Sequence, residues 1–556
     1  MVKLKGAVPL GLVILSLLVG SAYWLNQQNQ LASFVKQVES VKVNQKLPVD
    51  PKDYLAIKRD LITLQNTLNS SVFQLISGLF FFVTAYTAWL NFVASEKKQV
   101  SERFGKAIDQ LGNGGLGVRV GGIFALEQIA QSSPEEHWVV MEVLTSYVRD
   151  QSLKGKSVFK PNSEEENHLE ESNIQAVLRN IRAELAISVT TDIQAALTVI
   201  CRRNSSQDPK GKVIDLSFCD LRGADLKNAK LSNADLRGTK LSGANLEGAN
   251  LSCAKLQGTD LTLAVLNNAN LKKVKLNHAL LNSAHLEKAG LQDADLTNAQ
   301  LKAANLQQAK LNRSTLHFAV LTYAKLQGTD LNQSKLSFVN LRDSAIDSKT
   351  KLDKKWRRIH GININGAQNQ MLDGFDFSES VLTNANFEGA SLKNVSFNGA
   401  DLGGANFKNS HLENASFTKT DIMLNLDMAD FGGAHLQGAV FKEANIKCVN
   451  FKGVSRITDL STIIFEDVNL ANSIFQEASL VKAKFSRSML KDVDFRLADL
   501  TEAKFDNCYS YSQETNFEQA NLNNAEFTGS LGCANFRNSK YQGANFSNAD
   551  ISSAQF

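Results

Sequence analysis

The hydrophobic positions along most of the chain recur every five residues. In ADLRGTKLSGANLEGANL, residues 234–251, leucine stands at Leu236, Leu241, Leu246 and Leu251. An α-helix turns about 100° per residue, so leucines five apart would spread around its surface. A strand alternates its faces, so successive leucines would point to opposite sides. Neither element buries this pattern, and the chain must therefore turn every five residues.

The neighbours of each leucine indicate what this turning chain encloses. The series runs from Leu216 to Leu341 through 26 leucines, and Ile346 extends it. From position 219 to 344 the residue two places before each centre is small or modest in size, being Ala at 17 of 26 places. Residues two apart on an extended segment share a face, so leucine and its small neighbour both point inward. The Asn or Asp between them points outward, and the Gly, Ser and Asn that follow favour turns. Each pentapeptide is then one side of a coil, and stacked coils bury one another.

A second block of repeats, residues 372–556, adds a longer period. Its central residues alternate between leucine and phenylalanine from Leu372 to Phe417 and again from Leu460 to Phe505. In a coil with an even number of sides, each phenylalanine stacks on a phenylalanine of the next coil. In a coil with three sides, each phenylalanine would stack on a leucine. A coil with two sides would leave no interior for these side chains. The pattern therefore predicts four sides. Three breaks in register predict bulges: Ile422 to Leu426 is one residue short, Phe451 to Leu460 spans nine residues, and Phe505 to Phe517 carries two extra.

Two apolar stretches without charged residues lie near the amino terminus, at residues 6–25 and 72–94. A helix of this length measures about 30 Å, enough to cross the hydrocarbon core of a bilayer. Tyr23, Trp24 and Trp89 stand near the ends of the stretches, where interfacial aromatic residues are common. We therefore expect two transmembrane helices. A cleaved signal peptide is the alternative for the first stretch.

The segment between these stretches also has a helical pattern. Apolar residues from Tyr54 to Leu68 follow heptad spacing, and a shorter apolar seam runs from Leu31 to Val41. We expect an extramembrane helical hairpin folded as an antiparallel pair, although the same seam is compatible with a homo-oligomer. Basic residues before the first span and after the second favour a cytoplasmic location for both ends. The repeats would then be cytoplasmic, at a plasma or thylakoid membrane.

Residues 97–213 have the pattern of a helical segment. Helices are predicted at 101–112, 120–131, 133–150, 174–185 and 191–203, with an acidic loop at 162–173. Gly112, Gly114 and Gly117 match a dinucleotide-binding fingerprint, which requires a preceding strand. The residues before these glycines look helical, so we interpret them as a turn between two helices.

Repeats such as ADLRG, ANLEG and ANFKN resemble those of the pentapeptide-repeat family. The resemblance implies a mainly β fold, a right-handed quadrilateral β-helix with about 20 residues per coil. The segments SERFGKAIDQLG and WVVMEVLTSYVR before the repeats are similar to those of membrane-anchored members common in cyanobacteria. The predicted domains are two transmembrane helices with their hairpin at 1–96, the helical segment at 97–213, β-helix block 1 at 214–346, a connector at 347–371 and β-helix block 2 at 372–556.

Two sets of residues have predicted roles in this arrangement. The interior ladder consists of Leu216, Leu236, Leu241, Leu246 and Leu251 in block 1 and Phe377, Phe387, Phe397 and Phe407 in block 2. The connector abandons the repeat and is basic, and its KLDKKWRRI is predicted to be a short helix. Its candidate docking residues are Lys354, Lys355, Trp356, Arg357 and Arg358. They would bind a membrane surface or an acidic partner, and a plain linker is the alternative.

Charge and reactive side chains narrow the function classes. The net charge of +4 is too small to indicate nucleic-acid binding by itself. Residues 216–346 carry 16 Lys and Arg against 10 Asp and Glu, and residues 372–556 carry 15 against 23. The six scattered cysteines indicate unpaired thiols in a reducing compartment. No histidine of the repeats stands one regular coil length from another, so no catalytic, cofactor-binding or metal site is predicted.

These features predict a non-enzymatic, membrane-anchored scaffold that presents a rigid repeat surface to an unidentified protein partner, with no cofactor. The rival hypothesis is a regulatory or assembly subunit of a membrane transporter or photosynthetic complex. A third hypothesis is a gyrase inhibitor that mimics DNA, as some members of the family do. The predicted anchor and the basic block 1 both argue against that third function.

Overall fold

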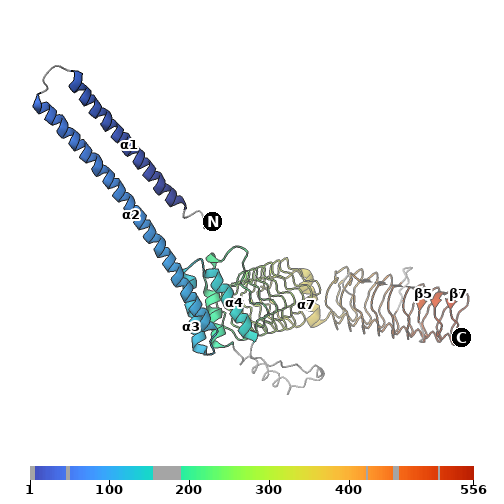
Figure 1. Cartoon of the computed structure of the whole chain (residues 1–556). Coiled ribbons are helices and arrows are strands. Elements are labelled where there is room, and N and C mark those ends of the chain that lie inside the picture. The colour runs from blue at the N-terminus through green and yellow to red at the C-terminus, as the bar shows by residue number, and fades with distance from the viewer. Residues whose placement is uncertain (1–6, 45–49, 154–188, 421–423, 455–462, 511–513) are drawn as a thin grey trace. The chain divides into compact units, whose positions relative to one another are not determined.

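The computed structural model describes residues 7–44, 50–153, 189–420, 424–454, 463–510 and 514–556 (Figure 1). The chain divides into two compact units, Met1–Ile108 and Asp109–Phe556. The first contains α1 (Ala7–Asn44) and most of α2 (Pro51–Leu111). The predicted domain boundary at residue 97 lies inside α2. The helices of the second unit are α3 (Leu116–Ser132), α4 (His137–Leu153), α6 (Thr191–Arg202), the 3-10 helix η1 (Ser205–Gln207) and α7 (Lys354–Asn365).

One helix in the described part of the chain is long and apolar enough to cross a membrane, by length and composition alone. It is the Lys52–Leu111 stretch of α2, which contains the second predicted span. Its Phe80, Phe81 and Phe82 are exposed, each by 70% or more of its surface. The first predicted span coincides with the beginning of α1, but most of its side chains lie outside the described residues. The first span and the antiparallel hairpin therefore stay predictions.

The helices α3, α4 and α6 pack against one another ahead of the repeats. Leu126, Leu144 and Leu197, one from each helix, are fully buried. Gly112 and Gly114 lie in the turn between the end of α2 and the beginning of α3, and Gly117 lies in the first turn of α3. The predicted helix at 174–185 and the acidic loop at 162–173 lie outside the described residues.

Each pentapeptide of the repeats forms one side of a coil followed by a tight turn. The Ala224 amide donates to the Leu221 carbonyl at 3.1 Å and closes the turn, and Gly223 in between has φ 65°. The Leu221 amide donates instead to the Lys240 carbonyl of the next coil, at 2.8 Å. Backbone groups that face neighbouring coils are thus paired along the stack. Parallel bridges join each outward residue to the residue four pentapeptides later, as Asp235 to Lys255, so a regular coil has four sides.

The interior of the stack is filled by the side chains of the predicted ladder. All nine of its residues have 0% exposed surface: Leu216, Leu236, Leu241, Leu246, Leu251, Phe377, Phe387, Phe397 and Phe407. Where the small position holds Thr or Ser, the buried hydroxyl is satisfied by backbone. Thr239, for example, donates to the Leu216 carbonyl of the preceding coil at 2.8 Å. These positions therefore tolerate a hydroxyl without an unpaired polar group.

Block 2 confirms the four-sided coil through its phenylalanines. Phe377 stacks on Phe397 with ring centroids 4.9 Å apart, and Phe387 stacks on Phe407 at 5.0 Å. Phe377 and Phe387 meet edge to face, at 5.7 Å and 73°. Two phenylalanine columns thus meet inside the coil. One side forms a parallel seven-stranded sheet of β1 (Ser416–Thr418), β2 (Val440–Lys442), β3 (Ile464–Glu466), β4 (Lys484–Ser486), β5 (Lys504–Tyr509), β6 (Glu526–Ser530) and β7 (Asn545–Asp550).

The predicted register breaks fall in coils that are longer than the regular ones. Asp401 pairs with Asn425, which is 24 residues later instead of the regular 20. This coil therefore contains one extra pentapeptide that is one residue short, in agreement with the break at Ile422. Asn445 pairs with Asn469 at the same spacing, in agreement with the break after Phe451. Residues 421–423 and 455–462 themselves lie outside the described part. Beyond Phe505, Asp499 pairs with Asn521 across a coil with the predicted excess of two.

The helical segment covers the first coil of block 1. The Lys230 amide donates to the Cys201 carbonyl at 3.0 Å. The Asp225 amide donates to Gln194 Oε1 at 2.9 Å, and Gln194 Nε2 donates to the Asp225 carbonyl at 2.8 Å. Farther along the stack, amides in these positions are paired with the preceding coil. Helix α6 therefore replaces the missing coil and protects the edge from pairing with other chains.

Candidate interaction surfaces

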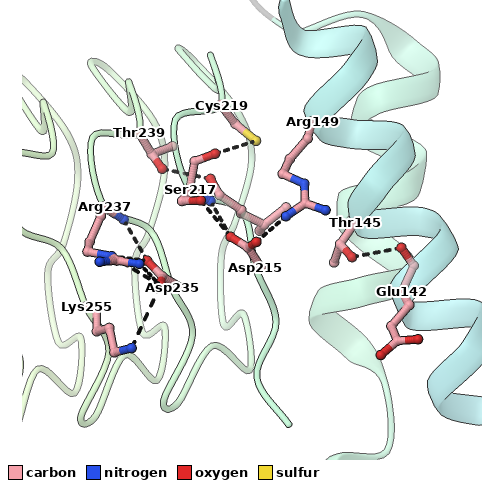
Figure 2. Close-up of polar contacts among 11 residues, drawn as sticks. Glu142, Thr145, Arg149, Asp215, Ser217, Cys219, Asp235, Arg237, Thr239 and Lys255 are labelled. Atoms are coloured by element: carbon pink, nitrogen blue, oxygen red, sulfur yellow. Dashed lines mark hydrogen bonds and ion pairs between the residues drawn. The ribbon is translucent and has the colours of Figure 1, made fainter.

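The polar ridges of the stack are held by ion pairs and side-chain ladders, beginning where α4 meets the first coil (Figure 2). Arg149 of α4 pairs with Asp215, which also accepts hydrogen bonds from the amide and hydroxyl of Ser217. On the next coil Arg237 pairs with Asp235 at 2.7 Å. Farther on, Asn270 donates to Asn250 at 3.1 Å along a column of amides. The ridges are thus polar, and many of their charged and amide side chains are paired with one another.

A buried carboxylate joins α3, α4 and α6, the three helices that we call the cap. Asp192, at the beginning of α6, accepts hydrogen bonds from Arg119 Nε at 2.7 Å and from the Tyr147 hydroxyl at 2.6 Å. Thr190 donates to its other oxygen at 2.5 Å. Burial alone would raise the pKa of Asp192, but these hydrogen bonds outweigh burial and lower it to about 2. Burial raises the pKa of Tyr147. We interpret this cluster as a structural clamp, because both carboxylate oxygens of Asp192 are engaged.

The connector forms α7, whose ends follow from its sequence. Asp353 caps the amino terminus by accepting a hydrogen bond from the Lys355 amide at 2.9 Å. Gly366, with φ 71°, ends the helix and donates to the Ile362 carbonyl at 2.8 Å. The side chains of Trp356 and Ile359 are buried against the repeats.

The predicted docking residues of the connector divide between two faces of α7. Lys355 donates to Asp376 at 2.7 Å and to the Ser378 carbonyl, and it is therefore a structural contact with block 2. Trp356 is only 9% exposed. Lys354, Arg357 and Arg358 instead line one groove of about 400 Å³, which we call the connector groove. Helical spacing explains this division, because residues 354, 357 and 358 share a face.

The structure also brings together a histidine pair that the sequence did not indicate. The rings of His411 and His435 stack with centroids 4.6 Å apart on neighbouring coils. They miss the regular coil spacing because the coil between them is one of the lengthened ones. Glu413 lies 3.5 Å from His411 Nδ1. Burial lowers the pKa of His435, and the neighbouring His411 lowers it further. The register break at Ile422 marks where the spacing changes, but only the structure shows that this coil is lengthened enough to bring the two histidines together.

Reactive groups are sparse among the described residues. All six cysteines are free, and burial raises the thiol pKa of Cys201 and Cys508 to about 12 and that of Cys219 to about 11. Thiols with such pKa values are poor nucleophiles at neutral pH. In the same described ranges no group of three or more His, Cys, Asp or Glu side chains is arranged to hold a metal ion.

The stacked coils and polar ridges define a parallel β-solenoid protein. A family model described as pentapeptide repeats matches residues 214–248, 229–268, 264–302, 299–337, 425–455, 463–502 and 530–556. A second pentapeptide-repeat model matches residues 377–421. The repeat part of the chain therefore belongs to the pentapeptide-repeat family.

Solved structures of pentapeptide-repeat proteins also match parts of the chain. HetL, involved in heterocyst differentiation regulation in the cyanobacterium Nostoc sp. strain PCC 7120, is 23% identical, with 50% of this chain and 89% of HetL covered and a TM-score of 0.20. Rfr23 from the cyanobacterium Cyanothece 51142 is 39% identical over 17% of this chain and 64% of Rfr23, with a TM-score of 0.17. QnrB1, a plasmid-mediated fluoroquinolone resistance protein, is 18% identical, with 32% of this chain and 90% of QnrB1 covered and a TM-score of 0.21. No curated protein sequence matches the chain.

Proposed function

We propose that this protein is a membrane-anchored scaffold that presents its pentapeptide-repeat surface to protein partners and carries out no catalysis. The observation that carries the proposal is the division of side chains in the repeats. Large apolar groups such as Leu236 and Phe387 are fully enclosed, and the outer ridges are polar and paired along the stack. A surface of this kind suits recognition, because it is ordered before binding and loses little conformational entropy.

The proposal also includes anchoring of the chain in a membrane. It is supported by the apolar stretch of α2, whose phenylalanines are exposed in the absence of a membrane. An exposed apolar surface of this length is costly in water and is favourable in a hydrocarbon core. The basic residues that follow the stretch support a cytoplasmic position for the repeats.

Crosslinking followed by pull-down from native membranes tests the scaffold function. The full-length chain should recover one or a few proteins reproducibly, and a variant that lacks residues 372–556 should lose part of that set. Recovery of no partner by the full-length chain would contradict the proposal. Co-purification with one stoichiometric transporter or photosynthetic complex would favour the rival function of a regulatory or assembly subunit.

A further inference from the structure

The connector groove concentrates positive charge in a concave surface. It has a volume of about 400 Å³, and its cationic residues are Lys354, Arg357 and Arg358, with no Asp or Glu among the described residues that line it. Many charged positions along the ridges occur instead in opposite-sign pairs, such as Arg313 with Asp293 and Lys504 with Glu526. The groove therefore differs from these ridge pairs by having a net positive charge that no carboxylate among its described lining residues neutralises.

The groove is held in place before any ligand arrives. His360 of α7 contacts the Ser344 carbonyl of block 1 at 2.8 Å, and Asn363 donates to the Val381 carbonyl of block 2 at 3.0 Å. Lys355 adds its ion pair to Asp376. With the helix fixed to both blocks, a ligand would not have to order the backbone that binds it, which favours affinity.

Two of the three cationic side chains in the groove have N–H donors that are not used in hydrogen bonds with the described residues. Lys354 is exposed and its amine makes no hydrogen bond or ion pair with the described residues, whereas Arg358 donates only through Nη2 to Gln370, at 2.9 Å. Arg357 is partly committed, because its Nη atoms donate to the carbonyls of Thr350 and Asp347. Lys354 and Arg358 are therefore the residues available for a charged ligand, and Arg357 adds its charge at short range.

We propose that the connector groove binds a carboxylate-rich segment of a protein partner, which deepens and rests on the scaffold function proposed above. Charge complementarity identifies carboxylates as the ligand groups. A protein segment fits better than a lipid surface because the groove is concave and the adjoining residues 372–556 carry 23 Asp and Glu against 15 Lys and Arg. An anionic membrane would repel that block, whereas a short acidic segment needs to contact only the groove.

The floor of the groove supplies a test of shape as well as charge. A Cβ added at Gly361 would meet no atom within 4 Å, so a larger side chain there would occupy the groove and leave the helix intact. Leucine also has a higher helix propensity than glycine. Gly361→Leu should therefore weaken binding of a segment seated in the groove, although the net charge is unchanged.

The experiment uses the full-length chain in nanodiscs of neutral phosphatidylcholine, with fluorescein-labelled octaglutamate as the probe and fluorescence anisotropy as the readout. Lys354→Glu/Arg358→Glu should weaken binding about tenfold, since two exposed attractions are replaced by repulsions. Gly361→Leu should also weaken it. The matched control Lys240→Glu/Lys302→Glu changes charge equally on exposed ridge positions and should bind like the wild type. Circular dichroism checks that each variant is folded.

Equal affinity of the wild type and Lys354→Glu/Arg358→Glu would overturn the proposal, as would unchanged binding by Gly361→Leu. Flotation with vesicles of phosphatidylcholine mixed with phosphatidylserine provides the second arm. Binding to these vesicles through Lys354 and Arg358, without binding to octaglutamate, would mean that the groove faces lipid and would also overturn it. If octaglutamate fails to bind but native pull-down still recovers partners, the scaffold function stands and only the groove assignment fails.

Discussion

At the scale of single residues, each corner of the coils requires one residue in the left-handed region. This position is occupied by glycine at Gly238, with φ 63°, and by asparagine at Asn228, with φ 55°, but also by Lys273 and Tyr323, with φ 57° and 60°. Glycine and asparagine adopt this conformation easily, whereas other side chains lose about 1–2 kcal/mol. The frequent Gly and Asn of the repeat are therefore a consequence of the turn.

Lys273 gives a direct test of that cost. Lys273→Asn should stabilise its coil by about 1–2 kcal/mol, and Lys273→Val should destabilise it, because a β-branched side chain clashes most at positive φ. Hydrogen exchange followed by mass spectrometry measures local stability in the coils around residue 273. The neighbouring Lys272 is also exposed but does not have positive φ, so Lys272→Val should cause a much smaller change.

The stacked histidines predict a dependence on pH. Because burial and His411 lower the pKa of His435 below its ordinary value of 6.5, the folded coil favours the neutral ring more than the unfolded chain does. The stabilisation is complete above pH 6.5 and is lost as the pH falls through the lowered pKa. Glu413 offsets part of the charge, and Lys393 opposes protonation.

Hydrogen exchange of residues 425–445 at pH 7.5 and 5.5 measures this effect. The wild type should lose protection at the lower pH, and His435→Gln should lose less. If both proteins lose protection equally, the histidine pair is not the source of the acid sensitivity. His317→Gln, on a coil of block 1 without a stacked histidine, is the matched control.

At the scale of elements, the phenylalanine columns supply the continuous packing of block 2. Phe441 has 0% exposed surface and stacks between Phe417, at 4.6 Å, and Phe465, at 5.0 Å. The three rings lie in register on β1, β2 and β3. Stacking at these spacings adds to the hydrophobic gain from enclosing the rings. Each ring therefore connects the coil before it to the coil after it.

Removing one ring should open several coils. Phe441→Ala should cost about 3–5 kcal/mol and should reduce exchange protection in β1 and β3 as well as in β2, whereas Phe441→Leu should cost less because it leaves a smaller cavity. Lys442→Ala removes an adjacent half-buried side chain and its surface ion pair with Glu466, and it should cost less than about 1 kcal/mol. A loss of protection confined to β2 in Phe441→Ala would contradict the stacked-column account.

The cap helices depend in the same way on Asp192. Asp192→Asn should destabilise the packing of α3, α4 and α6 by about 3 kcal/mol, because Arg119 and Tyr147 lose a buried charged acceptor. Since its pKa is lowered to about 2, below the ordinary 3.8, the stabilisation is present above pH 3.8 and is lost as the pH falls towards 2.

Exchange protection of the three cap helices between pH 6 and pH 3 measures this prediction. The variant should start with lower protection and should change less on acidification than the wild type. Asp492→Asn, at an exposed carboxylate in block 2, should leave the cap unaffected. Wild-type protection in the Asp192→Asn cap would show that the clamp contributes little.

At the scale of the whole molecule, the anchor is the part with the most direct physical test. Phe82 lies in the middle of the apolar stretch of α2 and is 75% exposed. Phe82→Arg should disfavour membrane insertion by about 3 kcal/mol. The wild type should remain in the pellet after alkaline carbonate extraction, and Phe82→Arg should be released in part. Thr63→Arg, outside the apolar stretch, should stay in the pellet. Release of the wild type would contradict the anchor.

The sequence by itself determined the coil and its interior. A leucine at every fifth position excludes a helix and a plain strand, and the regular alternation of leucine and phenylalanine excludes three sides. Both conclusions follow from local geometry, because buried residues must recur along the sequence at the same interval at which the chain turns. The same local rules predicted the connector helix from KLDKKWRRI and the turn at the glycine-rich stretch.

Only the tertiary structure decided which distant residues became neighbours. His411 and His435 meet because the coil between them is lengthened, and the register break at Ile422 marks the place of that change but not the length of the coil. Lys355 faces block 2 while Lys354 and Arg358 face the groove, because Trp356 and Ile359 fix the rotation of α7 by burying their side chains. Local periodicity determines which side chains point inward. Which residues of neighbouring coils or helices come into contact depends on the number of residues in each coil and on how each helix packs, and only the tertiary structure shows these.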